Sequence, residues 1–437
     1  MQLPPPDPDT LFEDLLQELP AETVAMAREF KAFVRAKKVK TPQQLLRVVF
    51  LYCGLDKSLR ETAANFTLLY EAIPDTSIAE RLAACRPWMQ AVLAKILHTN
   101  AVATLPAPWR FLVIDGSHVQ GPGAQGTQYR LHICMDLVQL QFVSITRTDQ
   151  HTGESLMHLP LGPRDIALAD RGYAYATPIV ETVRKQAEVI LRMSPAHLPV
   201  YDGDGQRVDL KQVLREQPWE THRTIDVSVQ APASLEVVCG YVHAYRLSEA
   251  QANAARRRLR AQSRKKGRPP KEATLFWAGW VLVFTTVAPS LLGAKTISAL
   301  YRVRWQIEIA IKRWKSVLDV GKLRAKEGSP LAAVWLLGKL LYALVVERRA
   351  RRRLGADWSR LDRERRGTFW RVWQLLQDEV GVHSLGVDAW REEGWEACMK
   401  IIMERPRRRQ LQRLPDEVID MYHGLPISDQ EELREAA

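Results

Sequence analysis

The segment from Tyr301 to Lys315 (YRVRWQIEIAIKRWK) combines a carboxylate with cations and a phenol. An α-helix turns by about 100° per residue. One helical face therefore collects Tyr301, Arg304, Glu308 and Lys315. The opposite face is apolar and must pack on a core, so the polar face would line a groove or an open site. The alternative is that Glu308 is a surface ion-pair partner of a cation one turn away.

Two further carboxylates, Asp115 and Asp170, each end a predicted β-strand. These strands are 109–115 (WRFLVID) and 165–170 (DIALAD). Two acids at neighbouring strand ends and Glu308 on a helix packed against the sheet could converge on one point. Clustered carboxylates repel one another unless cations neutralise them. Carboxylate oxygens suit Mg²⁺ or Mn²⁺, and two such ions support an in-line displacement at phosphorus. This arrangement predicts nuclease or strand-transfer chemistry.

Other residues compete for these roles. Asp136 and Glu154 are also predicted to lie near the sheet, and either could replace one of the three acids as a ligand. His118 could assist a proton transfer or form a local hydrogen bond. Ser117 and Arg171 could contact DNA beside the acids.

The composition favours a polyanionic partner. The chain has 437 residues, and 62 Lys and Arg against 50 Asp and Glu give a net charge of +12. Such an excess indicates nucleic acid before a membrane. The five cysteines are scattered without a CxxC pair, so neither a zinc site nor a disulfide framework is expected. Isolated cysteines fit a reducing cytoplasm, and the acidic, proline-rich start is unlike a signal peptide. A cytoplasmic protein is therefore expected.

One uncharged run challenges a soluble interpretation. Residues 276–294 carry no charge over 19 positions, which is near the length of a membrane span. However, Pro289 and Ser290 interrupt the run, and residues 281–287 are rich in β-branched side chains. A buried strand, a turn and the start of a helix explain the run better, so no membrane partner is expected.

Changes in pattern along the chain predict an α/β protein made of five segments. Helical patterns dominate both ends, and strand-like runs fill most of the middle. The C-terminal segment could dimerise or bind nucleic acid, and its sequence leaves both open. The segments are a helical one (1–105), a strand-rich one with a following helix (106–186), a second β-rich one (187–284), one containing the Tyr301–Lys315 helix (285–346) and a helical one (347–437).

Two short helices around a turn are predicted in the first segment. Capping-box patterns begin at Ser58 (SLRE) and Ser77 (SIAE), and the helix breaker Pro74 lies between them. The pair resembles a helix-turn-helix whose second helix, 77–84, would enter a major groove. An ordinary helical bundle would give the same pattern, and spacing alone does not separate the two.

The β-rich segment contains a basic stretch at 256–271 (RRRLRAQSRKKGRPPK), with nine Lys or Arg and no apolar period. This pattern predicts a basic loop or a disordered segment. Its KKGRPPK part could lie along the minor groove of A·T-rich DNA, contact phosphates without reading sequence, or be a solvated linker. The cations singled out as DNA contacts are Arg256, Arg257, Arg258, Lys265, Lys266 and Arg268.

Three motifs together resemble the DDE transposases of bacterial insertion sequences, in particular the insertion-sequence-four-type group. VIDGS at 113–117 is similar to the first-aspartate motif, and LADRGY at 168–173 is similar to the second. The third motif is the group's Y-x2-R-x3-E-x6-K signature, which Tyr301, Arg304, Glu308 and Lys315 reproduce. The resemblance spans roughly residues 55–345. It implies a ribonuclease H-like catalytic core (106–186 and 285–346) interrupted by a β-rich insertion, with helical N-terminal and C-terminal domains.

The resemblance also implies an activity. Such enzymes act as homodimers on the terminal inverted repeats of a mobile element, excise it and paste it into target DNA. A water molecule nicks the element's end, and the freed 3′-hydroxyl attacks the opposite strand to form a hairpin, which is reopened before strand transfer. By motif, Asp115, Asp170 and Glu308 would bind two Mg²⁺ ions, for which Mn²⁺ can substitute. Tyr301, Arg304 and Lys315 would hold phosphates of double-stranded DNA near the cut.

A tryptophan is also implied by the resemblance. In hairpin-forming relatives, a tryptophan at the start of the strand before the signature helix stacks on a base flipped out beside the cut. GWVLVFTT places Trp280 at that position, and Trp277 is the rival. Either could instead be an ordinary core residue.

Two other functions compete with transposition. A domesticated DNA-binding protein would keep the fold without cutting. A ribonuclease H-like nuclease would hydrolyse DNA without strand transfer.

Overall fold

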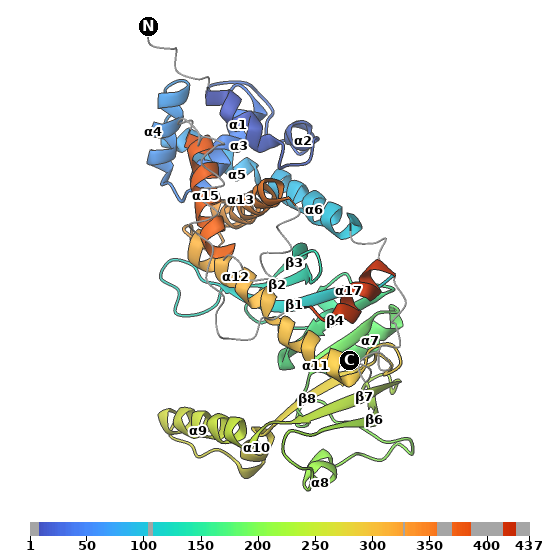
Figure 1. Ribbon diagram of the computed structural model, residues 1–437. Coiled ribbons are helices and arrows are strands. Elements are labelled where there is room, and N and C mark those ends of the chain that lie inside the picture. Colours follow the sequence, from blue (N-terminus) through green and yellow to red (C-terminus); the bar gives the residue numbers. More distant parts are fainter. Residues whose placement is uncertain (1–7, 104–107, 327, 356–368, 386–413, 425–437) are drawn as a thin grey trace.

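The computed structural model describes residues 8–103, 108–326, 328–355, 369–385 and 414–424. A bundle of helices lies at one end and a mixed β-sheet fills the middle and the other end (Figure 1). Helices α12 and α11 lie across the sheet, with α12 nearer the bundle and α11 nearer β8 (Figure 1). The arrangement is an α/β fold, as the sequence predicted.

Helices from both ends of the chain build the bundle. Ser58 begins α4 with a complete capping box to Glu61, which confirms the predicted helix start. The second predicted start is wrong, because α5 begins earlier, after Pro74. The bundle elements are α1 (Pro8–Leu16), α2 (Thr23–Glu29), α3 (Pro42–Val49), the π-helical turn η1 (Phe50–Gly54), α4 (Leu59–Leu69), α5 (Asp75–Ala84), α6 (Arg86–Ala103), α13 (Pro330–Leu354) and α15 (Phe369–Leu385).

Helix α13 is surrounded by the other bundle helices, and this explains its apolar sequence. Among the described helices, it is the one long and apolar enough to cross a membrane, yet 83% of its most apolar window is buried inside the fold. A helix that is hydrophobic on all sides is typical of a protein interior. Buried Arg349, near its C-terminal end, binds the Glu379 carboxylate of α15 at 2.6 Å.

A single eight-stranded sheet has the order β3-β2-β1-β4-β5-β8-β7-β6. Strands β1, β2 and β3 form an antiparallel meander. β4 joins β1 in parallel, and β5 joins β4 in parallel. The strands are β1 (Arg110–Val119), β2 (Tyr129–Asp136), β3 (Gln141–Asp149), β4 (Asp165–Ala169), β5 (Glu188–Arg192), β6 (His222–Gln230), β7 (Val237–Arg246) and β8 (Trp280–Thr285).

The β-rich segment 187–284 continues this sheet. Its strand β8 pairs antiparallel with both β5 and β7, so β6 and β7 extend the same surface. The uncharged run 276–294 contains the end of α10, then β8, then a turn before α11, which confirms the predicted strand, turn and helix start. The remaining elements are the 3-10 turns η2 (Leu156–His158) and η3 (Arg171–Tyr173), and the helices α7 (Ala176–Arg184), α8 (Leu210–Leu214), α9 (Glu249–Lys265), α10 (Glu272–Trp277), α11 (Ala294–Val303), α12 (Trp305–Leu318) and α17 (Asp416–His423).

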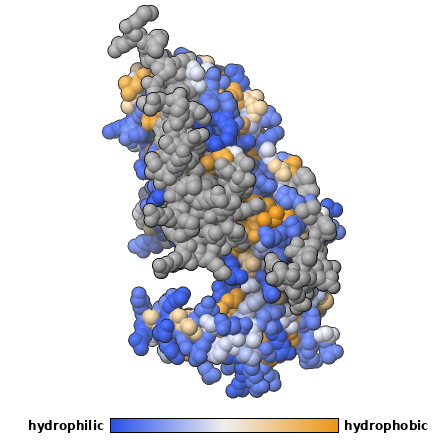
Figure 2. Space-filling view, in the orientation of Figure 1, coloured by the Kyte–Doolittle hydropathy of each residue, from blue (hydrophilic) through white to orange (hydrophobic). Residues whose placement is uncertain are grey.

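The basic loop predicted at 256–271 is helical as far as Lys265, so the prediction is wrong for residues 256–265. Residues 266–271 form a loop before α10, as predicted. Helix α9 begins at a capping box between Ser248 and Gln251, and its alanines, arginines and glutamines favour a helix. Ala252 is its one buried residue, because α9 projects from the sheet (Figure 1). An exposed helix needs no apolar stripe, and its surface is hydrophilic (Figure 2).

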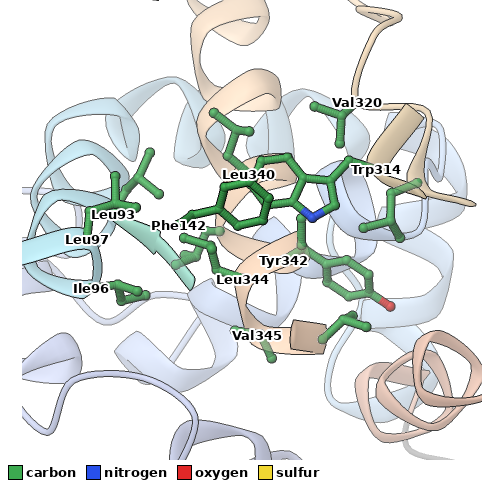
Figure 3. Packing of buried hydrophobic residues seen from close by; sticks show 14 of the residues in the cluster. Leu93, Ile96, Leu97, Phe142, Trp314, Val320, Leu340, Tyr342, Leu344 and Val345 are labelled. Atoms are coloured by element: carbon green, nitrogen blue, oxygen red, sulfur yellow. The ribbon is translucent and has the colours of Figure 1, made fainter. Parts of the chain in front are cut away.

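The predicted helix 301–315 is two helices that meet at Arg304. Arg304 ends α11 and precedes α12. The predicted apolar face is buried on α12, where the Trp314 ring packs on Phe142 of β3 with centroids 4.1 Å apart (Figure 3). Side chains of α6 and α13 complete this core between the bundle and the sheet. This packing fixes α12 across β1.

The C-terminal segment 347–437 is described only in part. Helix α13 extends through Leu354, and α15 and α17 follow, which agrees with a helical region. Residues 356–368, 386–413 and 425–437 lie outside the described residues.

Candidate active site

Strands β1 and β4 bring Asp115 and Asp170 to the same edge of the sheet. Their parallel register pairs Val113 with Leu168. Each aspartate lies two residues beyond that pair. Hydrogen-bonded strands are about 4.8 Å apart, so the two acids are lateral neighbours.

A buried ion pair holds the other end of the same two strands. Arg110 and Asp165 are register partners, and the Arg110 Nε and Nη2 atoms donate to the Asp165 carboxylate at 2.7 and 2.8 Å. The Gly162 N–H also donates to it, at 2.9 Å. A bidentate pair constrains geometry as well as charge. It therefore supports the register that sets Asp115 beside Asp170.

The surroundings of the Asp115 carboxylate disfavour its ionised form. Its Oδ1 accepts a hydrogen bond from the Gly116 N–H at 2.9 Å. Burial raises its pKa to about 6, and the charges of Glu308 and Asp170 add to the shift, whereas Arg304 opposes it. Asp115 thus lies within electrostatic range of both other predicted acids.

Asp170 is held by the turn that follows β4. Its side chain caps η3, where Oδ1 accepts a hydrogen bond from the Gly172 N–H at 2.8 Å. Arg171 is exposed beside it. Partial loss of hydration and the nearby charge of Arg192 lower the pKa of the Arg171 guanidinium. Two cations therefore lie close together next to the acids.

Glu308 lies in the first turn of α12 and is ion-paired with Arg304. The pair spans one helical turn, so the alternative of a local ion pair is present in the structure. However, Arg304 is buried, and its Nε and Nη1 atoms have no hydrogen-bond partner among the described residues. Its guanidinium also lies 5.6 Å from the Tyr301 ring centre. Unused donors on a buried guanidinium suit a phosphate better than a carboxylate alone.

The three acids supply the right donors for Mg²⁺, namely carboxylate oxygens. In the described part of the chain, however, no three His, Cys, Asp or Glu side chains are close enough to hold a metal ion. Each acid has its own partner: the Gly116 amide, the Gly172 amide and the Arg304 guanidinium. Gathering them around an ion requires Glu308 to separate from Arg304.

Lys315 lies further along α12 and approaches the acids. Burial lowers the pKa of its ammonium group, and the charge of Asp115 opposes this shift. Its stem faces the backbone at Gly321, where the Gln120 N–H donates to the Gly321 carbonyl at 2.8 Å. The chain after α12 is thereby fastened to the end of β1.

His118 and Ser117 are placed differently from the acids. The His118 Nδ1 lies 3.1 Å from the Thr127 hydroxyl, in agreement with the local hydrogen bond considered from the sequence. Ser117 is buried. A buried hydroxyl cannot reach DNA without a rearrangement of the strand.

The two rival carboxylates, Asp136 and Glu154, have different surroundings. Asp136 is fully buried and accepts hydrogen bonds from the Val138 and Gln139 amides, at 2.9 and 2.7 Å, so it shapes the β2–β3 turn. It is paired with Leu112, three residues before Asp115. Glu154 instead lies beside Asp170. Burial raises the pKa of the Glu154 carboxyl, and the negative charge of Asp170 raises it further.

Trp280 is only 4% exposed and lies opposite Arg246 in the β7–β8 pair. The Arg246 guanidinium lies 5.5 Å from the Trp280 ring centre and 4.1 Å from that of Trp219. Trp277 is half-buried and lines a cavity of about 370 Å³ beside α8. The sequence did not single out Trp219, which is 37% exposed. Its PWE loop just before a strand was the available signal.

The cations of the basic stretch have unequal surroundings. Arg256 is half-buried and donates to the Leu275 carbonyl and the Asn253 side chain, each at 3.1 Å. It therefore fastens α9 to α10. The remaining predicted DNA contacts, Arg257, Arg258, Lys265, Lys266 and Arg268, are exposed.

Comparison with known proteins identifies the family. Residues 107–344 match the family described as the transposase DDE domain. The chain is 30% identical over 335 residues to the protein described as transposase InsL for insertion sequence element IS186A of Escherichia coli K12, covering 75% of this chain and 90% of that one. The chain belongs to the DDE transposases of bacterial insertion sequences. The Escherichia coli transposase for IS421 is also 30% identical, with the same coverage. The transposase for IS231B of Bacillus thuringiensis is 24% identical over 37% of this chain and 36% of its own length.

Acidification is expected to weaken any divalent-ion binding in which the Asp115 carboxylate is a ligand. Because the Asp115 pKa is raised from 3.8 to about 6, the folded protein takes up a proton there at a pH where the unfolded chain does not. Ionised Asp115 thus costs stability above pH 6, and this cost disappears as pH falls towards 3.8. Protons and metal compete for the same oxygens, so Mn²⁺ affinity should fall by up to about tenfold per pH unit as the pH falls below about 6.

Titrating Mn²⁺ into the protein at several pH values, with calorimetric detection, measures this dependence. Asp115→Asn should bind weakly at every pH and show a flatter profile. An affinity unchanged from about pH 7 to about pH 5 would contradict a role for Asp115 as a ligand.

Proposed function

We propose that the protein is a DNA transposase that binds the terminal inverted repeats of its element and catalyses cut-and-paste transposition. The observation that carries this proposal is the register of β1 and β4, which aligns Asp115 with Asp170 below the helix bearing Glu308. Family membership supports the same activity. We also propose a ribonuclease H-like core, supported by three antiparallel strands followed by two parallel ones.

Asp115, Asp170 and Glu308 would hold two Mg²⁺ ions, or Mn²⁺ in their place. When bound, such ions activate the attacking oxygen and stabilise the leaving oxygen at phosphorus. The chain's own part is to bring the three carboxylates together. Separation of Glu308 from Arg304 would free a carboxylate for the ions and a guanidinium for DNA.

Arg304, Lys315 and Tyr301 would hold the phosphates beside the cut. Two nitrogens of buried Arg304 have no hydrogen-bond partner within the ranges that the structure describes, and Lys315 lies within electrostatic range of Asp115. Arg171 with Arg192 supplies a second cationic point beside Asp170. Cations on both sides of the acids would align the phosphodiester for in-line attack.

A hairpin intermediate accounts for the second strand cut. A water oxygen attacks phosphorus and the element's 3′-oxygen leaves. The resulting 3′-hydroxyl then attacks phosphorus on the opposite strand and displaces the 3′-oxygen of the flanking DNA, which closes the hairpin on the element end. A base extruded at the bend needs an aromatic partner. Trp280 would have to become accessible for this role, because Arg246 and the sheet now cover it.

Nicking of an element-end duplex by the purified protein tests the proposal. We expect Mg²⁺-dependent nicks at the element's 3′ ends, followed by joined products when a pre-cleaved end is supplied with target DNA. Intact end binding without nicking would favour the domesticated DNA-binding protein. Nicking without any joined product would favour a ribonuclease H-like nuclease.

Helix α9 is proposed to contact DNA phosphates. Replacing Arg257 and Arg258 with glutamine should lower the slope of log affinity against log salt by about 0.9 for each lost phosphate contact. Arg256 is left unchanged because its hydrogen bonds fasten α9. Arg184→Gln is the control, since that guanidinium is already paired with Glu181 and Glu236. An unchanged slope in the α9 variant would place this helix away from DNA.

Assembly is part of the proposal. Two protomers would hold the two ends of the element in a synaptic complex, with double-stranded target DNA joining later. The N-terminal helices α4 and α5 would read the terminal repeat, and the C-terminal helices would dimerise or bind DNA. Arg81 of α5 donates a hydrogen bond to the Arg35 carbonyl at 2.9 Å. Contact of the Arg81 side chain with DNA would require release of that bond.

A further inference from the structure

We infer that Glu154 is a fourth carboxylate of the acidic site and a direct ligand for a hard divalent cation, in addition to Asp115, Asp170 and Glu308. This inference rests on the proposed function, because it concerns the same ions. Glu154 lies on the loop between β3 and η2, outside the three motifs. Four observations carry the inference.

Two glycines of the aspartate motifs make room for the Glu154 carboxylate. A Cβ atom at Gly116 would overlap its Oε1, and a Cβ atom at Gly172 would overlap its Oε2. Gly116 follows Asp115, and Gly172 is the residue whose amide binds Asp170. The carboxylate of Glu154 is therefore enclosed by the backbones that hold both aspartates.

The loop that carries Glu154 is anchored. Asp149 Oδ1 accepts hydrogen bonds from the His151 and Thr152 amides, at 3.0 and 2.8 Å. Arg130 Nη1 donates to the Thr152 carbonyl at 2.8 Å. A fixed loop limits the entropy lost when Glu154 binds a ligand.

The Glu154 carboxylate lacks a partner in the described part of the chain. It is half-buried, and neither a hydrogen bond nor an ion pair to it is found among the described residues. Asp170 repels it, and Arg130 attracts it only at longer range. A half-buried carboxylate beside another carboxylate is unfavourable unless a cation binds between them.

A buried phenol points to the same place. Tyr173 is 0% exposed, and its hydroxyl has no hydrogen-bond partner among the described residues. Burial raises its pKa, and the negative charges of Glu154, Asp115 and Asp170 add to the shift. A phenolic O–H among three carboxylates can donate to a ligating carboxylate or to a water on the ion. Such a partner outside the ligands orients them.

Binding of Mn²⁺ to the full-length protein, measured by electron paramagnetic resonance without DNA, tests the inference. Glu154→Gln should weaken Mn²⁺ binding by about tenfold or more and raise the Mg²⁺ concentration for half-maximal nicking in parallel. Glu216→Gln, which removes an exposed carboxylate of the loop after α8, is the matched control and should bind like wild type. Mn²⁺ affinity of Glu154→Gln within about twofold of wild type overturns the inference.

A second variant removes Glu154 from its place without changing any acid. Gly116→Ala should push the flexible Glu154 side chain away, because the three atoms nearest the added Cβ all belong to Glu154. Alanine suits the backbone because φ is not positive there. It should lower Mn²⁺ affinity as Glu154→Gln does, and the double variant should be no worse than either. Additive losses in the double variant would overturn the inference.

Failure of the inference is distinguishable from failure of the proposed function. If Glu308→Gln loses Mn²⁺ binding and nicking while Glu154→Gln keeps both, the transposase stands with three acids. If the wild type neither binds Mn²⁺ nor nicks element ends, both proposals are overturned.

Discussion

Glu308→Gln is expected to reduce Mg²⁺-dependent nicking by at least about a hundredfold while element-end binding stays close to wild type. Glutamine keeps the size of the side chain but loses the charge that a divalent ion needs. Binding should persist because it depends on phosphate contacts elsewhere on the protein. Nicking and gel-shift assays on one labelled end duplex measure both quantities.

A matched control lies on the same helix. Asp319→Asn removes a carboxylate at the C-terminal end of α12, where φ is 52° and asparagine is well tolerated. Its nicking rate should resemble that of wild type. Normal cutting by Glu308→Gln would show that the triad assignment is wrong.

Asp165→Ala is expected to lower the free energy of unfolding by about 3–5 kcal/mol, because it leaves the buried Arg110 guanidinium without its carboxylate. The effect should exceed that of most single substitutions. It should also reduce nicking among molecules that remain folded, because the lost pair holds the register that aligns Asp115 with Asp170. Urea unfolding followed by tryptophan fluorescence measures the stability change.

An exposed ion pair provides the comparison. Glu236→Ala breaks an ion pair with Arg184 in which both side chains are exposed to solvent. Its unfolding midpoint should barely move, since solvent screens such pairs. Equal urea-unfolding midpoints for Asp165→Ala and wild type would show that the Arg110–Asp165 pair does not stabilise the register of β1 and β4.

The elements that carry the candidate site were readable from the sequence to the extent that local patterns determine them. Strands at Asp115 and before Asp170, and a helix bearing Glu308, follow from local patterns. However, β1 continues to Val119, so the prediction that a strand ends at Asp115 is wrong. The approach of Asp170 to Asp115 depends on β1 pairing with β4, which are separated by β2 and β3 in the chain. No local pattern specifies such a long-range pairing, and the family resemblance supplied it instead.

Other features escaped the sequence for physical reasons. The basic stretch lacks an apolar period because α9 is exposed along its length, so periodicity could not reveal a helix whose capping box begins before the basic run. The sequence singled out Glu154 only as a rival for one of the three acids, because it lies in a loop without regular structure. Its place beside both aspartate motifs became visible only from the two glycines that it faces. The break at Arg304 interrupts a sequence pattern that reads as one continuous helix.

The central claim is that three acids, distant in sequence, grip the same divalent ions. Anomalous diffraction from crystals of the protein with Mn²⁺ and an element-end duplex tests it most directly. We predict Mn²⁺ bound by the Asp115 and Asp170 carboxylates, with Glu308 released from Arg304 to complete the ligand set. Mn²⁺ bound without Asp115 and Asp170, or Glu308 still paired with Arg304 in a complex that cuts DNA, would contradict the account.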